Sequence, residues 1–300
     1  MLRAWFNQQG KTIKQMWPLL PAAAYLLGFL VIVCVYLIGL TFSVETSPGH
    51  FRFPSMHTVS IIIAGKQFSR ALVRTTLFVL VGTPLELVSG FFLAIILYGS
   101  FRLRSFIRGL FLIPLALPAL VTATMLFILF DFPGGHINHL LMGKYAVFPR
   151  LIPHPINWRG SPFFALGISL LGKVWRDAPI SMLILLAGLN AIDPEILDAA
   201  KTMGAGLRRR IWHVILPLMV PSLSAVLLLR SIEMWKEFIF PFILAGKYGL
   251  LGTLIESLYN DWGNSNQAAA VALILVLCIV VSTLLILWVM EILKKNVLKA

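Results

Sequence analysis

Six long apolar runs are the feature that most constrains the fold of this chain. A helix needs about 20 apolar residues to cross the hydrocarbon core of a bilayer, and each run reaches that length. Inside a bilayer a lipid-facing segment must satisfy its own backbone hydrogen bonds, so helices are expected. We therefore predict an all-α polytopic membrane protein with six transmembrane helices in one domain, 1–300, at about 21–44, 75–98, 106–130, 163–189, 218–245 and 268–292.

The composition excludes other classes. The chain is 59% hydrophobic and 12% charged, whereas soluble domains are about 45–50% apolar and about 25% charged. A net charge of +13 could indicate nucleic acid as a partner, but the cations gather in the short segments between the apolar runs. That distribution is typical of membrane topology, so we expect a lipid bilayer as the surroundings and no nucleic acid.

The basic segments also predict the orientation. Cytoplasmic loops of membrane proteins are enriched in lysine and arginine. We expect the N-terminal segment 1–18, the polar segment 190–217 and the C-terminus in the cytoplasm, and segments 45–74, 131–161 and 247–267 outside. The cations that support this are Arg3, Lys11, Lys14, Arg102, Arg104, Arg108, Lys201, Arg208, Arg209, Arg210, Lys294, Lys295 and Lys299.

The segment 190–217 carries helix signals of its own. Asp193 can cap a helix that begins at Pro194, because proline lacks the N–H that would otherwise be unpaired at the first position. Gly204 is a natural stop. The helix between them has a small apolar face and an opposite face with Asp198 and Lys201. We expect the apolar face to dock against another molecule, through Ile196, Ala199, Ala200 and Met203.

A family resemblance follows from this segment. The order Asp198-Ala199-Ala200, three residues, Gly204, nine residues and Val214-Ile-Leu-Pro217 resembles the EAA loop of binding-protein-dependent ABC importer permeases, most closely the carbohydrate type. Asp198 stands where glutamate is usual and Val214 where isoleucine is usual. Met203-Gly204 replaces the Asp-Gly that is common in the carbohydrate group, so polyamine-type permeases stay open.

The resemblance implies a fold, partners and a set of contact residues. It implies a type I ABC importer permease in a prokaryotic inner membrane, importing a sugar or oligosaccharide by alternating access. The expected partners are cytoplasmic ABC ATPase subunits, a second permease subunit and an extracytoplasmic solute-binding protein. ATP hydrolysis would lie on the separate ATPase, so the chain is no enzyme and needs no cofactor. The ATPase-coupling residues would be Asp198, Ala199, Ala200, Met203, Gly204 and Pro217.

Charged residues inside the fourth and fifth apolar runs are candidates for the solute path. Charge near the middle of a bilayer is costly unless it faces a bundle interior or a water-filled path. Arg230, Glu233 and Glu237 have the spacing of one helical face. A sugar could exchange hydrogen bonds with such groups, although the same charges could simply neutralise one another. The substrate-pathway candidates are Lys173, Arg176, Asp177, Arg230, Glu233, Trp235 and Glu237.

Other functions fit less well. An ion-coupled secondary transporter could use Glu86, Asp177, Glu233 and Glu237 as proton carriers, but it needs no cytosolic docking helix and no inverted repeat is visible. His136 and His139 lie beside Asp131 without a fourth ligand, so we predict no metal. Neither a zinc-protease motif nor a Gly-x-Ser-x-Gly elbow occurs, and a membrane-embedded enzyme is therefore the weakest interpretation.

Overall fold

The computed structural model describes residue 18 and residues 20–47, 50–99, 101–145 and 148–297. The predicted segment 1–18 lies outside the described residues apart from Pro18. A short antiparallel hairpin of β1 (Val44–Ser47) and β2 (His50–Arg52) is present, and all other regular elements of the described part are helical. The predicted all-α polytopic class is therefore confirmed, with this one small exception.

The helices follow the predicted order. The N-terminal half contains α2 (Leu20–Thr41), α3 (His57–Ala64), α4 (Lys66–Tyr98), α5 (Arg104–Ala116), α6 (Ala119–Leu129) and α7 (His136–Leu141). The C-terminal half contains α8 (Pro162–Asn190), α9 (Pro194–Thr202), α10 (Leu207–Arg210), a π-helical turn (Ile211–Ile215), α11 (Leu216–Leu218), α12 (Val220–Trp235), α13 (Ile239–Leu244), α14 (Leu251–Glu256) and α15 (Ser265–Val297).

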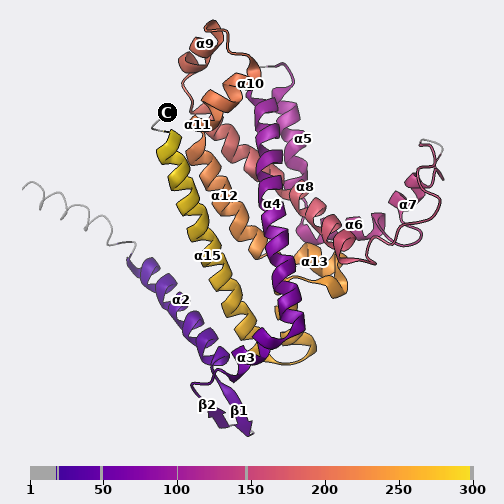
Figure 1. The fold of residues 1–300 in the computed structure, drawn as a ribbon, viewed down its shortest axis with the longest axis vertical. Coiled ribbons are helices and arrows are strands. Elements are labelled where there is room, and N and C mark those ends of the chain that lie inside the picture. Colours follow the sequence, from indigo (N-terminus) through magenta and orange to yellow (C-terminus); the bar gives the residue numbers. More distant parts are fainter. Residues whose placement is uncertain (1–17, 19, 48–49, 100, 146–147, 298–300) are drawn as a thin grey trace, which may run out of the picture.

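The long helices α4, α8, α12 and α15 form the body of the molecule, and α2 lies beside α15 at one edge (Figure 1). Three helices are long and apolar enough to span a membrane alone, namely α2, α4 and α15, and the number rises to six when bent helix pairs are counted as spans. The surface of α2 and α15 is covered with exposed leucine, valine and isoleucine. Lipid is the solvent that such a surface requires.

Two ends of the bundle can be distinguished in Figure 1. The basic end holds α9, α10, the start of α5 and the last turns of α15, with Arg104, Arg208, Arg209, Arg210, Lys294 and Lys295. The hairpin end holds β1, β2, α3 and the starts of α4 and α15. These six described basic residues, all of which the sequence assigned to the cytoplasmic side, therefore lie at one end of the molecule.

The third span is broken, which the sequence analysis did not predict. Helices α5 and α6 meet at 87°. Leu117 has the extended angles φ −80° and ψ 135° at the break. A proline disfavours the helical conformation of the residue before it, and Pro118 therefore explains why the helix stops at this point.

The predicted fifth span and the three predicted outer loops also differ from the structure. Helix α12 ends at Trp235 and α13 begins at Ile239, because Pro241 cannot donate to the carbonyl of Glu237 four residues earlier. The prediction that Glu237 shares one helical face with Arg230 was therefore wrong. The predicted outer segments also contain helices, since α3 and the start of α4 lie within 45–74, α7 lies within 131–161 and α14 lies within 247–267.

Close contact between α4 and α8 depends on Gly90. A Cβ atom at this position would lie 2.4 Å from Ser181 Cβ and 2.9 Å from the Met182 backbone nitrogen. Small residues allow helices in a bilayer to approach closely, and here the neighbour is partly backbone, which cannot rotate away. The same interface includes Ala94 and Leu97 of α4, both fully buried.

We expect Gly90→Ala to destabilise the subunit by about 1–3 kcal/mol, because overpacking forces two backbones apart. The measurement is the midpoint of thermal unfolding of the purified protein in detergent. Gly167→Ala on α8 is the matched control, since nothing lies within 4 Å of a Cβ atom there. Equal midpoints for the two variants would contradict the close approach.

Candidate functional site

The polar segment between α8 and α12 forms the helix that its local signals predict. The Asp193 carboxylate accepts a hydrogen bond from the Glu195 backbone N–H at 3.0 Å, which caps the first turn of α9. Gly204 has a φ of +77°, and this left-handed residue follows the C-cap of α9 and stops the helix. The Gly204 and Ala205 amides donate to the carbonyls of Lys201 and Ala200. The predicted cap and stop are both confirmed.

Helix α9 turns most of its apolar residues away from the protein. Met203, just beyond its last turn, is 87% exposed and Ile196 is 44% exposed, while Leu197 is its buried residue. Leu197 belongs to the apolar cluster that includes Leu97 of α4 and Leu189 of α8. The helix is therefore anchored on the bundle by one side and leaves the other side exposed.

A hollow of about 480 Å³ lies behind this loop. Ile196 reaches it from α9, and Lys294 reaches it from the end of α15. Pro217, a residue of the predicted coupling motif, lines it from α11 and is half-buried. Of the other motif residues, Asp198 and Ala199 are exposed and Asp198 pairs with Lys201 at 2.6 Å. The structure thus brings the motif residues together at the basic end.

A second group of functional candidates lies within the bundle. Lys173 of α8 forms ion pairs with Asp177 one turn later and with Glu237 at 3.3 Å, and its ammonium lies 4.0 Å from Glu233. Arg230 of α12 pairs with Glu233 at 2.9 Å and lies 3.7 Å from Glu86 of α4. With Arg176 these side chains form the charge cluster, whose members are Glu86, Lys173, Arg176, Asp177, Arg230, Glu233 and Glu237.

The charge cluster joins spans that are distant in the sequence. Its members come from α4, α8, α12 and the break between α12 and α13. The Glu237 carboxylate accepts from the Phe240 backbone N–H at 3.1 Å and so caps α13. Arg176 pairs with Asp177 at 2.5 Å and donates to the Leu117 carbonyl at 3.2 Å, at the break between α5 and α6. Both broken spans are therefore held by a member of the cluster.

Burial divides the charge cluster into an inner and an outer part. The side chains of Arg230 and Glu86 are fully buried, and those of Lys173 and Asp177 are nearly so. Glu233 keeps 32% of its side chain exposed and Arg176 keeps 24%. Buried ions need partners, because an unpaired charge in a low-dielectric interior is strongly destabilising. The outer part, Glu233 and Arg176, is therefore the more accessible portion of the charge cluster.

Two remaining candidates, Trp235 and Glu86, lie in surroundings that the sequence did not predict. Trp235 is buried in an apolar cluster that also contains Phe78, Leu250 and Leu258, and within the described residues it is no member of the ion pairs. Glu86 was considered only as a proton carrier, and its position beside Arg230 was missed. A lone carboxylate in the middle of an apolar run was the available signal, since such a group requires a cationic neighbour.

His136, at the start of α7, contacts the Tyr145 hydroxyl through its Nδ1 atom at 2.7 Å.

The fold and these two regions define a membrane-spanning subunit of a solute transporter. The chain belongs to the family of binding-protein-dependent transport system inner membrane components, whose match covers residues 86–299. It is therefore an inner-membrane permease subunit, and the resemblance drawn from the loop 190–217 is confirmed. The family match includes the whole charge cluster and the whole loop.

Several curated relatives are permeases of named transport systems. The chain is 29% identical to the trehalose/maltose transport system permease protein MalF of Thermococcus litoralis, over 72% of this chain and 73% of that protein. It is 31% identical to the xylose/arabinose import permease protein XacH of Haloferax volcanii, over 70% and 67%. It is 28% identical to the sulfoquinovosyl glycerol transport system permease protein SmoG of Agrobacterium fabrum, over 87% and 86%.

A solved structure supports the fold. A chain in the crystal structure of a bacterial alginate ABC transporter, in complex with an alginate pentasaccharide-bound periplasmic protein, superposes with a TM-score of 0.78. The identity is 18%, and the alignment covers 95% of this chain and 98% of that chain. The predicted type I ABC importer permease fold is therefore confirmed over nearly the full length.

Proposed function

We propose that this chain is the permease subunit of an ATP-driven, binding-protein-dependent importer of a sugar or oligosaccharide. The exposed apolar face of α9 carries the proposal, since it leaves Ile196, Ala199 and Met203 without a partner at the basic end of the bundle. Basic segments of membrane proteins favour the cytoplasm. A cytoplasmic ABC ATPase is the partner that meets this face, with Asp198, Ala200, Gly204 and Pro217 shaping the contact.

The transport cycle would follow from this attachment. Closure of an ATPase pair displaces α9, and Leu197 passes the displacement to the apolar cluster of α4 and α8. The spans then exchange an outward-open arrangement for an inward-open one around the solute. ATP hydrolysis lies on the ATPase subunits, and this chain contributes no hydrolytic group. The segment 190–217 acts as the coupling loop.

The solute path would lie along the outer part of the charge cluster. Glu233 and Arg176 reach the surface of the bundle, where a second permease subunit can complete the passage. A sugar hydroxyl donates to a carboxylate and accepts from a guanidinium, so the two side chains suit a polyhydroxy solute. Their positions are fixed by the inner charges: Asp177 pairs with Arg176, Arg230 pairs with Glu233, and Lys173 lies near Glu233 and pairs with Glu237. Sugar names among the relatives support the same solute class.

Uptake into proteoliposomes tests the proposal. The chain is reconstituted with the ATPase, second permease and binding protein of the same organism's transport system, and radiolabelled trehalose, maltose, xylose, arabinose and putrescine are offered outside. We expect ATP-dependent accumulation of at least one sugar, because alternating access is driven by the ATPase. The matched control is an ATPase subunit that binds ATP without hydrolysing it.

Two outcomes would contradict the proposal. Accumulation of putrescine alone would indicate the polyamine-type permease that the sequence left open. Accumulation driven by a proton gradient without ATP would indicate an ion-coupled carrier, with the membrane carboxylates as the coupling groups.

A further inference from the structure

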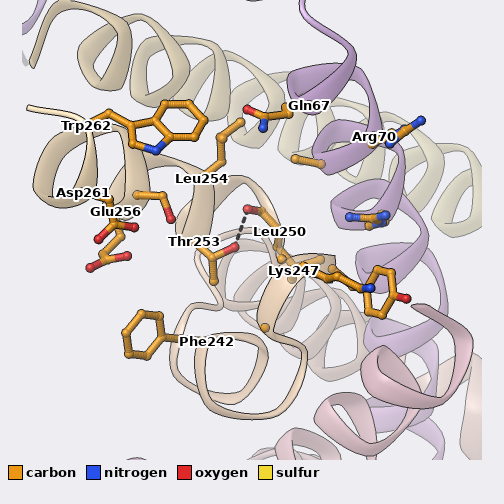
Figure 2. A pocket seen from close by; sticks show the side chains of 16 residues that line it. Gln67, Arg70, Phe242, Lys247, Leu250, Thr253, Leu254, Glu256, Asp261 and Trp262 are labelled. Carbon is orange, nitrogen blue, oxygen red and sulfur yellow. Dashed lines mark hydrogen bonds between the residues drawn. The ribbon is translucent and has the colours of Figure 1, made fainter. Parts of the chain in front are cut away.

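A second hollow lies at the hairpin end, far along the bundle from α9. Its volume is about 720 Å³, within the range of about 300–1,000 Å³ that is typical of small-molecule pockets. It lies between the first turns of α4 and the segment from α13 to the start of α15 (Figure 2). None of the charge-cluster residues lines it, so it is separate from the site described above.

One wall of this hollow is cationic. Arg70 and Arg74 lie one turn apart on α4, and Lys247 faces them from the turn after α13. The Arg74 guanidinium lies 5.3 Å from the centre of the Tyr248 ring, and the Lys247 ammonium lies 5.2 Å from it. The Tyr248 hydroxyl donates to the Gly160 carbonyl at 2.8 Å, which holds the ring beside both cations. This wall offers hydrogen-bond donors.

The facing wall is acidic. Glu256 ends α14 and Asp261 follows in the next turn, and Figure 2 shows both apart from Lys247 and Arg70. All the lining residues belong to the described part of the chain, and within it neither carboxylate comes within 4.0 Å of any of the three cations. Asn260 donates to Glu256 at 3.2 Å. This wall therefore keeps acceptors directed at the hollow instead of using them in ion pairs.

Two aromatic rings complete the lining. Trp262 is 55% exposed and Phe242 is 44% exposed. Tryptophan is costly to leave in water, and a half-exposed indole in a hollow offers a flat apolar surface beside polar groups. Thr253 and Ser257 also line the hollow, and the Thr253 hydroxyl donates to the Leu250 carbonyl at 2.8 Å.

We propose that this hollow is an external carbohydrate subsite, which holds one or two pyranose rings before they enter the membrane. A pyranose has an apolar face of C–H groups that stacks on an indole, and a rim of hydroxyls that donate and accept at once. Donors on one wall, acceptors on the other and an exposed indole satisfy both properties together. The proposal rests on the sugar-import function above, because that function supplies the ligand.

Photolabelling tests the subsite in the assembled complex without the binding protein. The probes are diazirine derivatives of trehalose, maltose and xylose, and the labelled peptides are located by mass spectrometry. We expect label within residues 242–262, removed by an excess of the unmodified sugar. Trp262→Ala should lower the labelling by about tenfold, and Asp261→Asn by a smaller factor.

Tyr259→Ala is the matched control. Tyr259 is 59% exposed and lies three residues before Trp262, but it does not line the hollow. Its labelling should equal that of the unchanged complex. In the uptake assay Trp262→Ala should raise the KM for the sugar and leave kcat unchanged, because it weakens binding without altering the coupling loop.

The outcomes separate this inference from the function on which it rests. The subsite is overturned, and the import function stands, if sugar is taken up but residues 242–262 carry no label. The same conclusion follows if Trp262→Ala does not reduce the labelling. Label that appears only when the binding protein is present also overturns it, because the hollow would then serve that protein. Absence of sugar uptake overturns the proposed function itself.

Discussion

Replacing Gly204 with valine is expected to abolish ATP hydrolysis that depends on the solute-loaded binding protein, while the subunit still inserts into the membrane. The φ of +77° at Gly204 is strained for a β-branched residue, and the cost is about 1 kcal/mol or more. A relaxed turn would redirect α9 and its exposed face. The measurement is the ATPase rate of the purified complex with and without the loaded binding protein.

Gly206→Val provides the matched control for this prediction. Gly206 lies two residues further on with a φ of −62°, and nothing lies within 4 Å of a Cβ atom there. Its stimulated ATPase rate should stay close to that of the unchanged complex. Normal stimulation in Gly204→Val would show that the angle of α9 does not control coupling.

Replacing Arg230 with methionine is expected to destabilise the subunit by about 3–5 kcal/mol, because it leaves buried carboxylates without their cation. Arg230 is fully buried and lies against both Glu86 and Glu233. The folded fraction should fall steeply, as measured by size-exclusion chromatography of detergent extracts over a temperature series. Lys236→Met is the matched control, since Lys236 is exposed at the end of α12 and belongs to no ion pair in the described part of the chain.

Rescue variants then distinguish a structural cluster from one that handles solute. Arg230→Met with Glu233→Met still leaves Glu86 buried and unpaired, so it should rescue poorly. Adding Glu86→Gln should restore assembly, because the buried charges are then removed together. If uptake returns as well, the cluster serves only the fold; if assembly returns while uptake stays lost, Glu233 and its partners serve the solute. A stable, active Arg230→Met variant would contradict the buried pairing.

The sequence could predict α9 closely because its signals are local. Asp193 needs only the amide of Glu195, and Gly204 needs only its own backbone angles. The six apolar runs are local in the same sense, since length and hydropathy are enough to identify a span. The basic segments predicted the orientation, and the described ones lie at one end of the bundle, as a single cytoplasmic side requires.

The sequence could not predict the breaks or the pairing. Pro118 and Pro241 were visible, but prolines are tolerated in membrane helices when neighbouring groups bind the freed carbonyls. At the break between α5 and α6, Arg176 also binds the Leu117 carbonyl, and this bond joins residues that are 59 positions apart in the sequence. The meeting of Glu86 with Arg230 also depends on how α4 packs on α12. Such contacts are properties of the assembled bundle, and no single run encodes them.

Leu197 is the main attachment of α9 to the bundle. It is the one residue of this helix that is buried, while Ala200 is half-buried. Met203 lies six residues further along, a distance of about 9 Å at 1.5 Å per residue. If α9 tilts about Leu197, we expect the exposed Met203 end to move farthest. We expect a force directed through Leu197 to be borne instead by α4 and α8, whose apolar residues share its cluster.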